Sequence, residues 1–257
     1  MTEPSNVIPL AVDRQDDSAE FAYRTIRRSI LMGHTAPGAV LSQVTLAQEL
    51  GISRTPLREA LNRLTTEGLV TSDFNRRMRV SSLDLDDFDQ IYAARLALEP
   101  VGVMATVGRL DEAARTELAA HVSEMDAAIE INDMEAFRLA HRAFHLGLTS
   151  GAGARISRML ADLWDHSERY RLTYLHYDES RPGQTLDERL RLSQTEHRQL
   201  LETAVAGDSS DCATILTAHL TRTLEAVFRE MVPAPHRRVA HLALDYGASH
   251  SRGTGNI

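Results

Sequence analysis

Residues 51–64 of the chain read Gly51-Ile-Ser-Arg-Thr-Pro-Leu-Arg-Glu-Ala-Leu-Asn-Arg-Leu64. Apolar residues recur there with the spacing of one helix face, at Leu57, Ala60, Leu61 and Leu64. Arg54, Arg58 and Asn62 recur every four residues and fall on a second, polar face. The pattern predicts an amphipathic helix over about 54–67, with one face in a core and the other exposed.

The start of this predicted helix is chemically suited to an anion. Ser53 and Thr55 are capping-type residues, and Pro56 is suited to a first helical turn. Free backbone N–H groups, two hydroxyls and two guanidiniums would meet there, which favours phosphate and the acceptor atoms of guanine in the major groove. The alternative is a solvated helix with surface arginines.

The neighbouring segments complete a small unit around this helix. A short helix is predicted over about 43–50, and Gly51 ends it, so that the two helices form a helix-turn-helix. Another helix is predicted from Ser18 to about Met32. Strand-type residues at 69–71 and 78–81 flank a polar tip and predict a β-hairpin. Its tip would be a wing that reaches the DNA backbone or minor groove, with Asn75, Arg76 and Arg77.

Charge and composition narrow the class of protein. The net charge is -8, but residues 51–80 are locally basic and the acidic excess lies after residue 82. A local basic surface on an acidic body is compatible with phosphate binding. No apolar run is long enough to span a bilayer, and the N-terminus does not resemble a secretory signal. The single cysteine, Cys212, excludes an internal disulfide framework, so we expect a cytoplasmic protein without membrane contact.

From Asp84 onward the pattern changes to long helical periodicities, which cover about 86–109, 112–130, 133–149, 153–176, 186–206 and 209–231. The predicted fold is therefore mainly α, with an N-terminal winged helix-turn-helix and a C-terminal antiparallel all-α bundle. The predicted domains are a flexible arm (1–17), a DNA-binding domain (18–82), an all-α effector and metal-binding domain (85–232) and a tail (233–257).

Residues 20–81 resemble the winged helix-turn-helix of the GntR family of bacterial transcription regulators. The resemblance rests on Pro37-Gly38, Leu41, Leu46-Ala47, Leu50 to Leu61, Leu64 and Glu67-Gly-Leu-Val70. It implies DNA contacts by Ser53, Arg54, Thr55, Arg58 and Asn75. The family usually has glycine at the wing tip; Asn75 tolerates the left-handed conformation, and Arg76 and Arg77 add charge.

A second constellation consists of four histidines on apolar helix stripes. His141 and His145 are four residues apart and share a face with Phe137, Phe144 and Leu148. His197 and His219 lie on the apolar faces of two later helices. Burying four unpaired imidazoles is costly, and a divalent metal bound by their neutral nitrogens removes that cost. The alternative is that each is a hydrogen-bonded core residue.

Residues 85–231 resemble the all-α ligand-binding domain of the FadR branch of that family. The resemblance implies a metal held by Asp-x-x-x-His on one helix and by one histidine on each of two later helices. His145, His197 and His219 fall on the histidine positions, and His141 stands at the Asp position. The histidine at this position implies either an all-imidazole site suited to zinc or nickel, or a site that is weakened or lost.

Three residues of this domain are candidates for binding an effector. Arg95 and Glu99 are four residues apart, which indicates either a helix salt bridge or an arginine that meets an effector carboxylate. Arg171 and Tyr174 are candidates of the same kind. A metal with an open position and an arginine nearby would suit a small organic acid.

The sequence thus predicts a ligand-responsive transcription regulator that binds double-stranded operator DNA as a homodimer. A metal-dependent enzyme is the rival interpretation. The segment His141-Arg-Ala-Phe-His145 lacks the glutamate of His-Glu-x-x-His enzymes, and no nucleophile elbow, phosphate loop or dinucleotide fingerprint occurs, so we expect no enzyme. A metal sensor, in which the ion itself is the signal, is a third interpretation.

Overall fold

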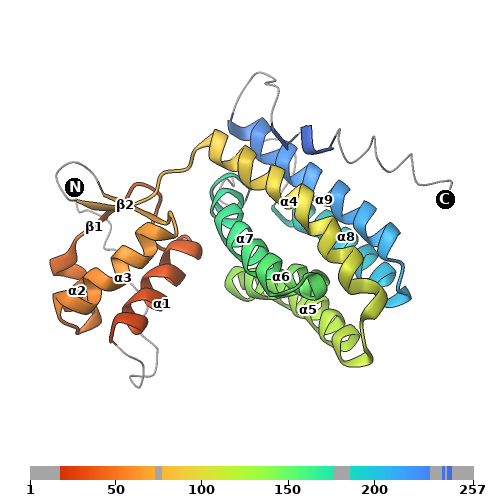
Figure 1. Ribbon diagram of the computed structural model, residues 1–257, viewed down its shortest axis with the longest axis horizontal. Helices are drawn as coiled ribbons and strands as arrows, with labels where there is room; N and C mark the ends of the chain where they lie inside the picture. The colour runs from red at the N-terminus through yellow and green to blue at the C-terminus, as the bar shows by residue number, and fades with distance from the viewer. Residues whose placement is uncertain (1–17, 73–76, 176–185, 232–238, 241, 245–257) are drawn as a thin grey trace. The chain divides into compact units, whose positions relative to one another are not determined.

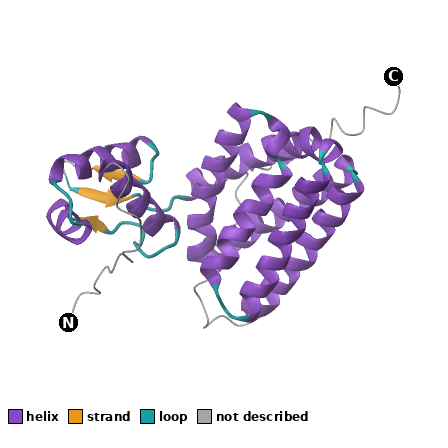
Figure 2. Ribbon diagram, turned by 90° about the horizontal axis from the view of Figure 1, so that it is seen from below, coloured by secondary structure: helices purple, strands orange, loops and turns teal. Residues whose placement is uncertain are grey.

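The computed structural model describes residues 18–72, 77–175, 186–231, 239–240 and 242–244 (Figure 1). The chain divides into two compact units, residues 1–84 and 85–257. Among the described residues, strands occur only in the first unit, and the second unit is built of helices (Figure 2). The mainly α fold is confirmed. The predicted arm (1–17) and the wing residues Asn75 and Arg76 lie outside the described residues.

The first unit packs three helices around one small core. Its elements are α1 (Ser18–Leu31), β1 (Val40–Leu41), α2 (Gln43–Leu50), α3 (Arg54–Thr66), β2 (Val70–Ser72) and β3 (Met78–Val80). The apolar stripes of the three helices and one side of the strands meet in a cluster of buried side chains that includes Ile26, Leu46, Leu57, Leu61 and Val80. Periodicity alone had predicted these helices to within a residue or two, because each has one buried face.

The strands form a three-stranded antiparallel sheet in the order β1-β3-β2. The predicted hairpin is β2 and β3, in which Val70 pairs with Val80. The sequence analysis missed β1, in which Leu41 pairs with Met78 on the other side of β3. Two residues are too few to show a strand periodicity, so β1 is fixed by its partner rather than by its own sequence.

The second unit is a helical bundle (Figure 1). Its elements are α4 (Leu85–Thr106), η1 (Val107–Arg109), α5 (Glu112–Glu130), α6 (Met134–Leu148), η2 (Ser150–Ala152), α7 (Ala154–Leu175), α8 (Leu186–Ala206) and α9 (Ser209–Met231). Helix α4 packs against α7 and α9, and α5 packs against α6 and α8. The side-chain carboxylates of Asp111 and Asp133 accept backbone N–H groups at the starts of α5 and α6, so these two helix starts are set by local sequence.

A close approach of backbones positions the end of α6 against α4. A Cβ added at Gly102 on α4 would lie 2.8 Å from the Cβ of Thr149, so only glycine is accommodated without a shift. The backbone N–H of Gly151 donates to the hydroxyl of Thr106 at 2.8 Å. These contacts hold the helix that carries His141 and His145 against the centre of the unit.

Part of the segment that we predicted as a tail (233–257) also belongs to the second unit. Residues 239–240 and 242–244 are helical, and Ala240 is fully buried. The backbone N–H groups of Val239 and Ala240 donate to the carboxylate of Asp89 on α4, at 2.6 and 3.3 Å. This short helix start is thus bound by a side chain distant in sequence, which local periodicity cannot reveal. Among the described residues, no helix is both long and apolar enough to cross a membrane.

Candidate functional site

The exposed face of α3 carries two arginines that the fold itself does not use. Arg54 and Arg58 are exposed and have no hydrogen-bond or ion-pair partner within the part of the chain that the structure describes. Arg63 on the same helix differs, because it donates to Glu20 at 2.6 Å and its guanidinium lies 3.8 Å from the centre of the Tyr23 ring. Arg63 therefore holds α3 against α1, whereas Arg54 and Arg58 are available to an external partner.

The start of α3 is also open to an external partner. Gly51 has a positive φ of 65° and ends α2, while its N–H donates to the carbonyl of Ala47. Ser53 is the N-cap of α3, and its side chain makes no capping hydrogen bond. A surface hollow of about 630 Å³ lies beside this start. It is lined by Gln43, Arg54, Thr55, Arg58, Leu61, Asn62, Ser72 and Met78. Arg77, the described residue of the predicted wing, is exposed just before β3.

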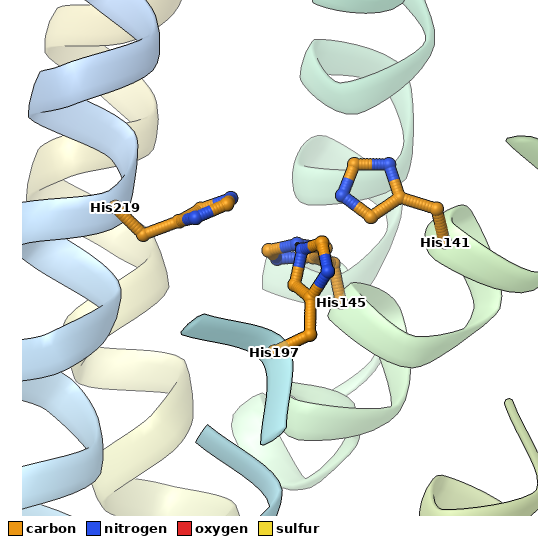
Figure 3. Close-up of side chains that lie close together, drawn as sticks. All are labelled: His141, His145, His197 and His219. Atoms are coloured by element: carbon orange, nitrogen blue, oxygen red, sulfur yellow. Dashed lines mark hydrogen bonds between the residues drawn. The ribbon is translucent and has the colours of Figure 1, made fainter. Parts of the chain in front are cut away.

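The four predicted histidines meet inside the second unit (Figure 3). Helix α6 supplies His141 and His145, α8 supplies His197 and α9 supplies His219. All four are buried, and one ring nitrogen from each lies within 4.8 Å of those of the others. The interiors of three helices thus bring together residues that are up to 78 positions apart in the sequence.

Two of the imidazoles are held with a lone pair directed into the cluster. The Nδ1 of His197 lies 2.7 Å from the side-chain oxygen of Gln194, and the Nδ1 of His219 lies 2.6 Å from a carboxylate oxygen of Glu196. These oxygens only accept hydrogen bonds, so each Nδ1 carries the proton and donates it. The Nε2 of each ring is then unprotonated, which is the form that binds a metal.

The spacing of the nitrogens matches two ligands of one ion. The Nε2 atoms of His145 and His197 are 3.3 Å apart. Two nitrogens that are each about 2.0–2.1 Å from one tetrahedral zinc ion lie about 3.3–3.4 Å from each other. The donor set therefore fits a divalent transition metal, because neutral imidazole nitrogens are ligands that zinc and nickel accept.

His141 has a different environment. Its Nδ1 lies 2.9 Å from a terminal nitrogen of Arg171, and a guanidinium can only donate. Nδ1 therefore accepts this hydrogen bond. The Nε2 of His141 is buried and has no hydrogen-bond partner among the described residues.

Burial keeps the cluster uncharged. It lowers the pKa of His141, His145 and His197 well below the usual range, and the positive guanidiniums nearby act in the same direction. The pKa of His219 is lowered to about 3, again mainly by burial and then by Arg171. All four rings are accordingly neutral at physiological pH, as metal binding requires.

Two of the three predicted effector residues, Arg95 and Arg171, lie beside this cluster in buried ion pairs. Arg95 donates to Glu99 at 2.5 Å and to the hydroxyl of Ser167 at 2.8 Å. The i,i+4 salt bridge that we considered for Arg95 is therefore formed. Arg171 donates to Glu168 at 2.8 Å in addition to His141. Tyr174 is half-buried, one helical turn farther along α7.

Several polar atoms around the cluster were not predicted from the sequence. The ring of Trp164 packs against those of His141 and His145, with centroids 5.2 and 6.1 Å apart. Buried atoms without a hydrogen-bond partner in the described part of the chain include Tyr92 Oη, Trp164 Nε1, Glu99 Oε2, Glu168 Oε1 and Arg171 Nε. Buried polar groups are seldom left unpaired, so these atoms are available to a ligand as donors and acceptors. The sequence analysis also missed Gln194, although its position three residues before His197 is a usable signal.

A helix-turn-helix with a small sheet, joined to an all-helical unit, is an architecture of transcription regulators. Two family models match the chain: bacterial regulatory proteins of the gntR family at residues 18–80, and the FCD domain at residues 90–222. The chain belongs to the GntR family and carries an FCD domain.

Individual relatives agree with this assignment. The Nta operon transcriptional regulator of Aminobacter aminovorans is 29% identical over 194 residues, which cover 76% of this chain and 87% of that protein. The HTH-type transcriptional repressor GlaR of Escherichia coli is 26% identical over 216 residues, covering 81% and 95%. The structure of E. coli McbR/YncC has a TM-score of 0.73 at 23% identity, covering 85% of this chain and all of that one. These relatives are regulators and not enzymes, as the sequence predicted.

Proposed function

We propose that this protein is a FadR-branch regulator that binds operator DNA as a homodimer, and that a small organic acid bound at a metal in the helical unit controls this binding. The observation that carries the proposal is the pair of inward Nε2 atoms of His197 and His219, each fixed by an acceptor oxygen behind it. A ring held this way is prepared for a metal, because the metal-binding tautomer is set before the ion arrives.

The DNA contacts are assigned to the exposed side of α3. The guanidiniums of Arg54 and Arg58, which have no partner among the described residues, would meet base edges or phosphates, with Ser53 and Thr55 at the helix start. The wing residues Asn75, Arg76 and Arg77 would contact the backbone or minor groove. A two-fold dimer would present two copies of α3 to half-sites about one turn of DNA apart. Operator binding by a bacterial regulator takes place in the cytoplasm, where we expect this protein.

The metal is assigned to the histidine cluster, with His145, His197 and His219 as ligands. Three neutral imidazoles leave part of the coordination sphere open, and the bound ion would supply an electrophilic centre that holds an anionic oxygen. Zinc is the proposed ion and nickel the alternative.

The effector is assigned to the buried polar residues beside the cluster. Arg95 and Arg171 come from α4 and α7, and the ring of Trp164 packs against both guanidiniums and against the ring of His141. A carboxylate on the metal could pair its remaining groups with these arginines and with the unpartnered atoms of Tyr92 and Glu168. We propose that binding there favours one arrangement of the DNA-binding units over another.

A thermal-shift screen of organic acids on the zinc-loaded protein, repeated after chelation, tests this function. We expect at least one acid to raise the unfolding temperature only when zinc is present, and the same acid to release operator DNA. The variant His121→Ala, which removes a histidine outside the cluster, should behave like the wild type. If only neutral or cationic compounds stabilise the protein, the acid-on-metal proposal is wrong. If zinc alone switches DNA binding, the protein is a metal sensor instead.

A further inference from the structure

The direction of one hydrogen bond sets the chemistry of His141. Arg171 donates from a terminal nitrogen to the Nδ1 of His141 at 2.9 Å. A protonated Nδ1 would place two donors against each other at this distance, so Nδ1 carries no proton. In a neutral imidazole the proton is then on Nε2.

The protonated nitrogen faces the cluster. Figure 3 shows one ring nitrogen of His141 directed toward the other three imidazoles and the other directed away from them. One ring nitrogen of His141 belongs to the group of nitrogens within 4.8 Å of one another. An N–H nitrogen has no lone pair for a metal, so in this tautomer His141 is a donor that faces a bound ion rather than a ligand of it.

Arg171 is itself held in place to maintain this tautomer. It donates to Glu168 at 2.8 Å from the same terminal nitrogen, and both side chains are buried on α7. The ring of His141 also packs against Phe137, at a centroid distance of 5.5 Å, and against Trp164, at 5.2 Å. Rotation of the imidazole to exchange its nitrogens would break the hydrogen bond from Arg171 and disturb this packing.

We propose that His141 is a hydrogen-bond donor to an anionic oxygen held on the metal, that Arg171 is the residue that positions it, and that the metal has three imidazole ligands, from His145, His197 and His219. This inference rests on the proposed function, since it assumes that the cluster holds a metal. It makes the centre selective for ligands that present an acceptor oxygen beside the metal-bound oxygen, as a carboxylate does. Three neutral ligands also leave the charge of the ion uncompensated, which favours an anion.

The ligand count is tested first, on the wild-type chain. X-ray absorption at the zinc edge of the zinc-loaded protein should show three imidazoles, and four would overturn the proposal. In competition with a chelator, His141→Ala should weaken zinc binding by less than about tenfold, whereas His145→Ala should weaken it by more than about a hundredfold. Equal losses in the two variants would make His141 a fourth ligand and overturn the proposal.

The donor role is tested with acetate as the probe, on the cobalt-substituted protein, by titration of its visible spectrum. His141→Ala should weaken acetate binding by about tenfold to a hundredfold, the range for a hydrogen bond to a charged group. His141→Gln should bind acetate within about threefold of the wild type, since an amide can both accept from Arg171 and donate inward. Equal acetate affinities in the wild type and the alanine variant would refute the donor role.

Failure of the proposed function gives a different result. A wild-type protein that takes up no zinc or cobalt would remove the metal proposal, and with it this inference. A wild-type protein that binds zinc through four imidazoles would leave the metal proposal standing and remove only the role assigned to His141. Circular dichroism of each variant confirms that a loss of binding is not a loss of fold, and the ligand count needs no variant.

Discussion

The carboxylate of Glu196 should control how tightly the centre holds zinc, although it does not touch the ion. It accepts the Nδ1 proton of His219 at 2.6 Å and also pairs with Arg222, and Glu196 is largely buried. Replacing Glu196 by Gln keeps the size of the side chain and removes its charge. The neutral amide is a weaker acceptor for His219, and one of its two ends must now be a donor that faces Arg222 or His219.

The expected loss of zinc affinity follows from the role of a group that hydrogen-bonds to a metal ligand without touching the ion. Removing one typically weakens metal binding by about tenfold to a hundredfold. At a free zinc concentration near 1,000 times the wild-type dissociation constant, zinc should stabilise the wild type by about 4 kcal/mol. For Glu196→Gln the same zinc concentration should give about 1.4–2.7 kcal/mol, so the zinc-induced rise in unfolding temperature should fall to between about one third and two thirds of the wild-type rise.

The assay is thermal unfolding in chelator-buffered zinc, with the metal-free form of each variant as its own reference. Glu202→Gln is the matched control, because Glu202 is exposed on the same helix and the substitution is chemically identical. The control should retain the full zinc response. If Glu196→Gln and Glu202→Gln respond to zinc alike, His219 is not a ligand and the reasoning from its tautomer is refuted.

Arg58→Ala should weaken operator binding by about 1–3 kcal/mol at fixed salt if its contact is to guanine. Arg155→Ala removes the same charge at an exposed position of α7 and should leave operator binding unchanged. Equal affinities of the two variants, measured by fluorescence anisotropy, would contradict the assignment. His145→Ala should abolish the zinc-induced rise in unfolding temperature, and a rise as large as that of the wild type would exclude His145 as a ligand. Burial lowers the pKa of the four cluster histidines, so the free energy of unfolding of the metal-free protein is not reduced by their protonation above about pH 6.5. This free energy of unfolding should fall by up to about 1.4 kcal/mol per imidazole per pH unit as the pH falls from 6.5 toward the folded-state pKa, which for His219 is about 3. Denaturant unfolding that gives the same free energy at pH 7 and pH 5 would contradict this.

The sequence predicted those features that repeat along one element. The buried face of α3 and its exposed arginines follow from spacings of three and four residues, and so does the inward position of each histidine on its own helix. That the four rings share one point depends on how α6, α8 and α9 pack, which spacing alone does not give. Here the resemblance to a known family supplied what periodicity could not.

The features that the sequence did not predict are set by partners distant in the chain. Strand β1 forms because β3 is beside it, and Ala240 is buried because Asp89 on α4 accepts its N–H. The tautomer of His141 depends on Arg171, thirty positions away. Tyr92 escaped notice because residues of α4 are buried on several sides, so its apolar pattern has no single face.

The central claim is that an organic acid acts on DNA binding through the metal. It is tested most directly by titrating acids into the zinc-loaded protein bound to an operator duplex, which the protein itself selects from random sequences, and by repeating the titration with the chelated protein. We expect an acid to change the operator affinity of the zinc-loaded protein, by about 5- to 150-fold for a typical coupling energy, and to have no effect after chelation. An acid that changes operator affinity equally with and without the metal would contradict the account.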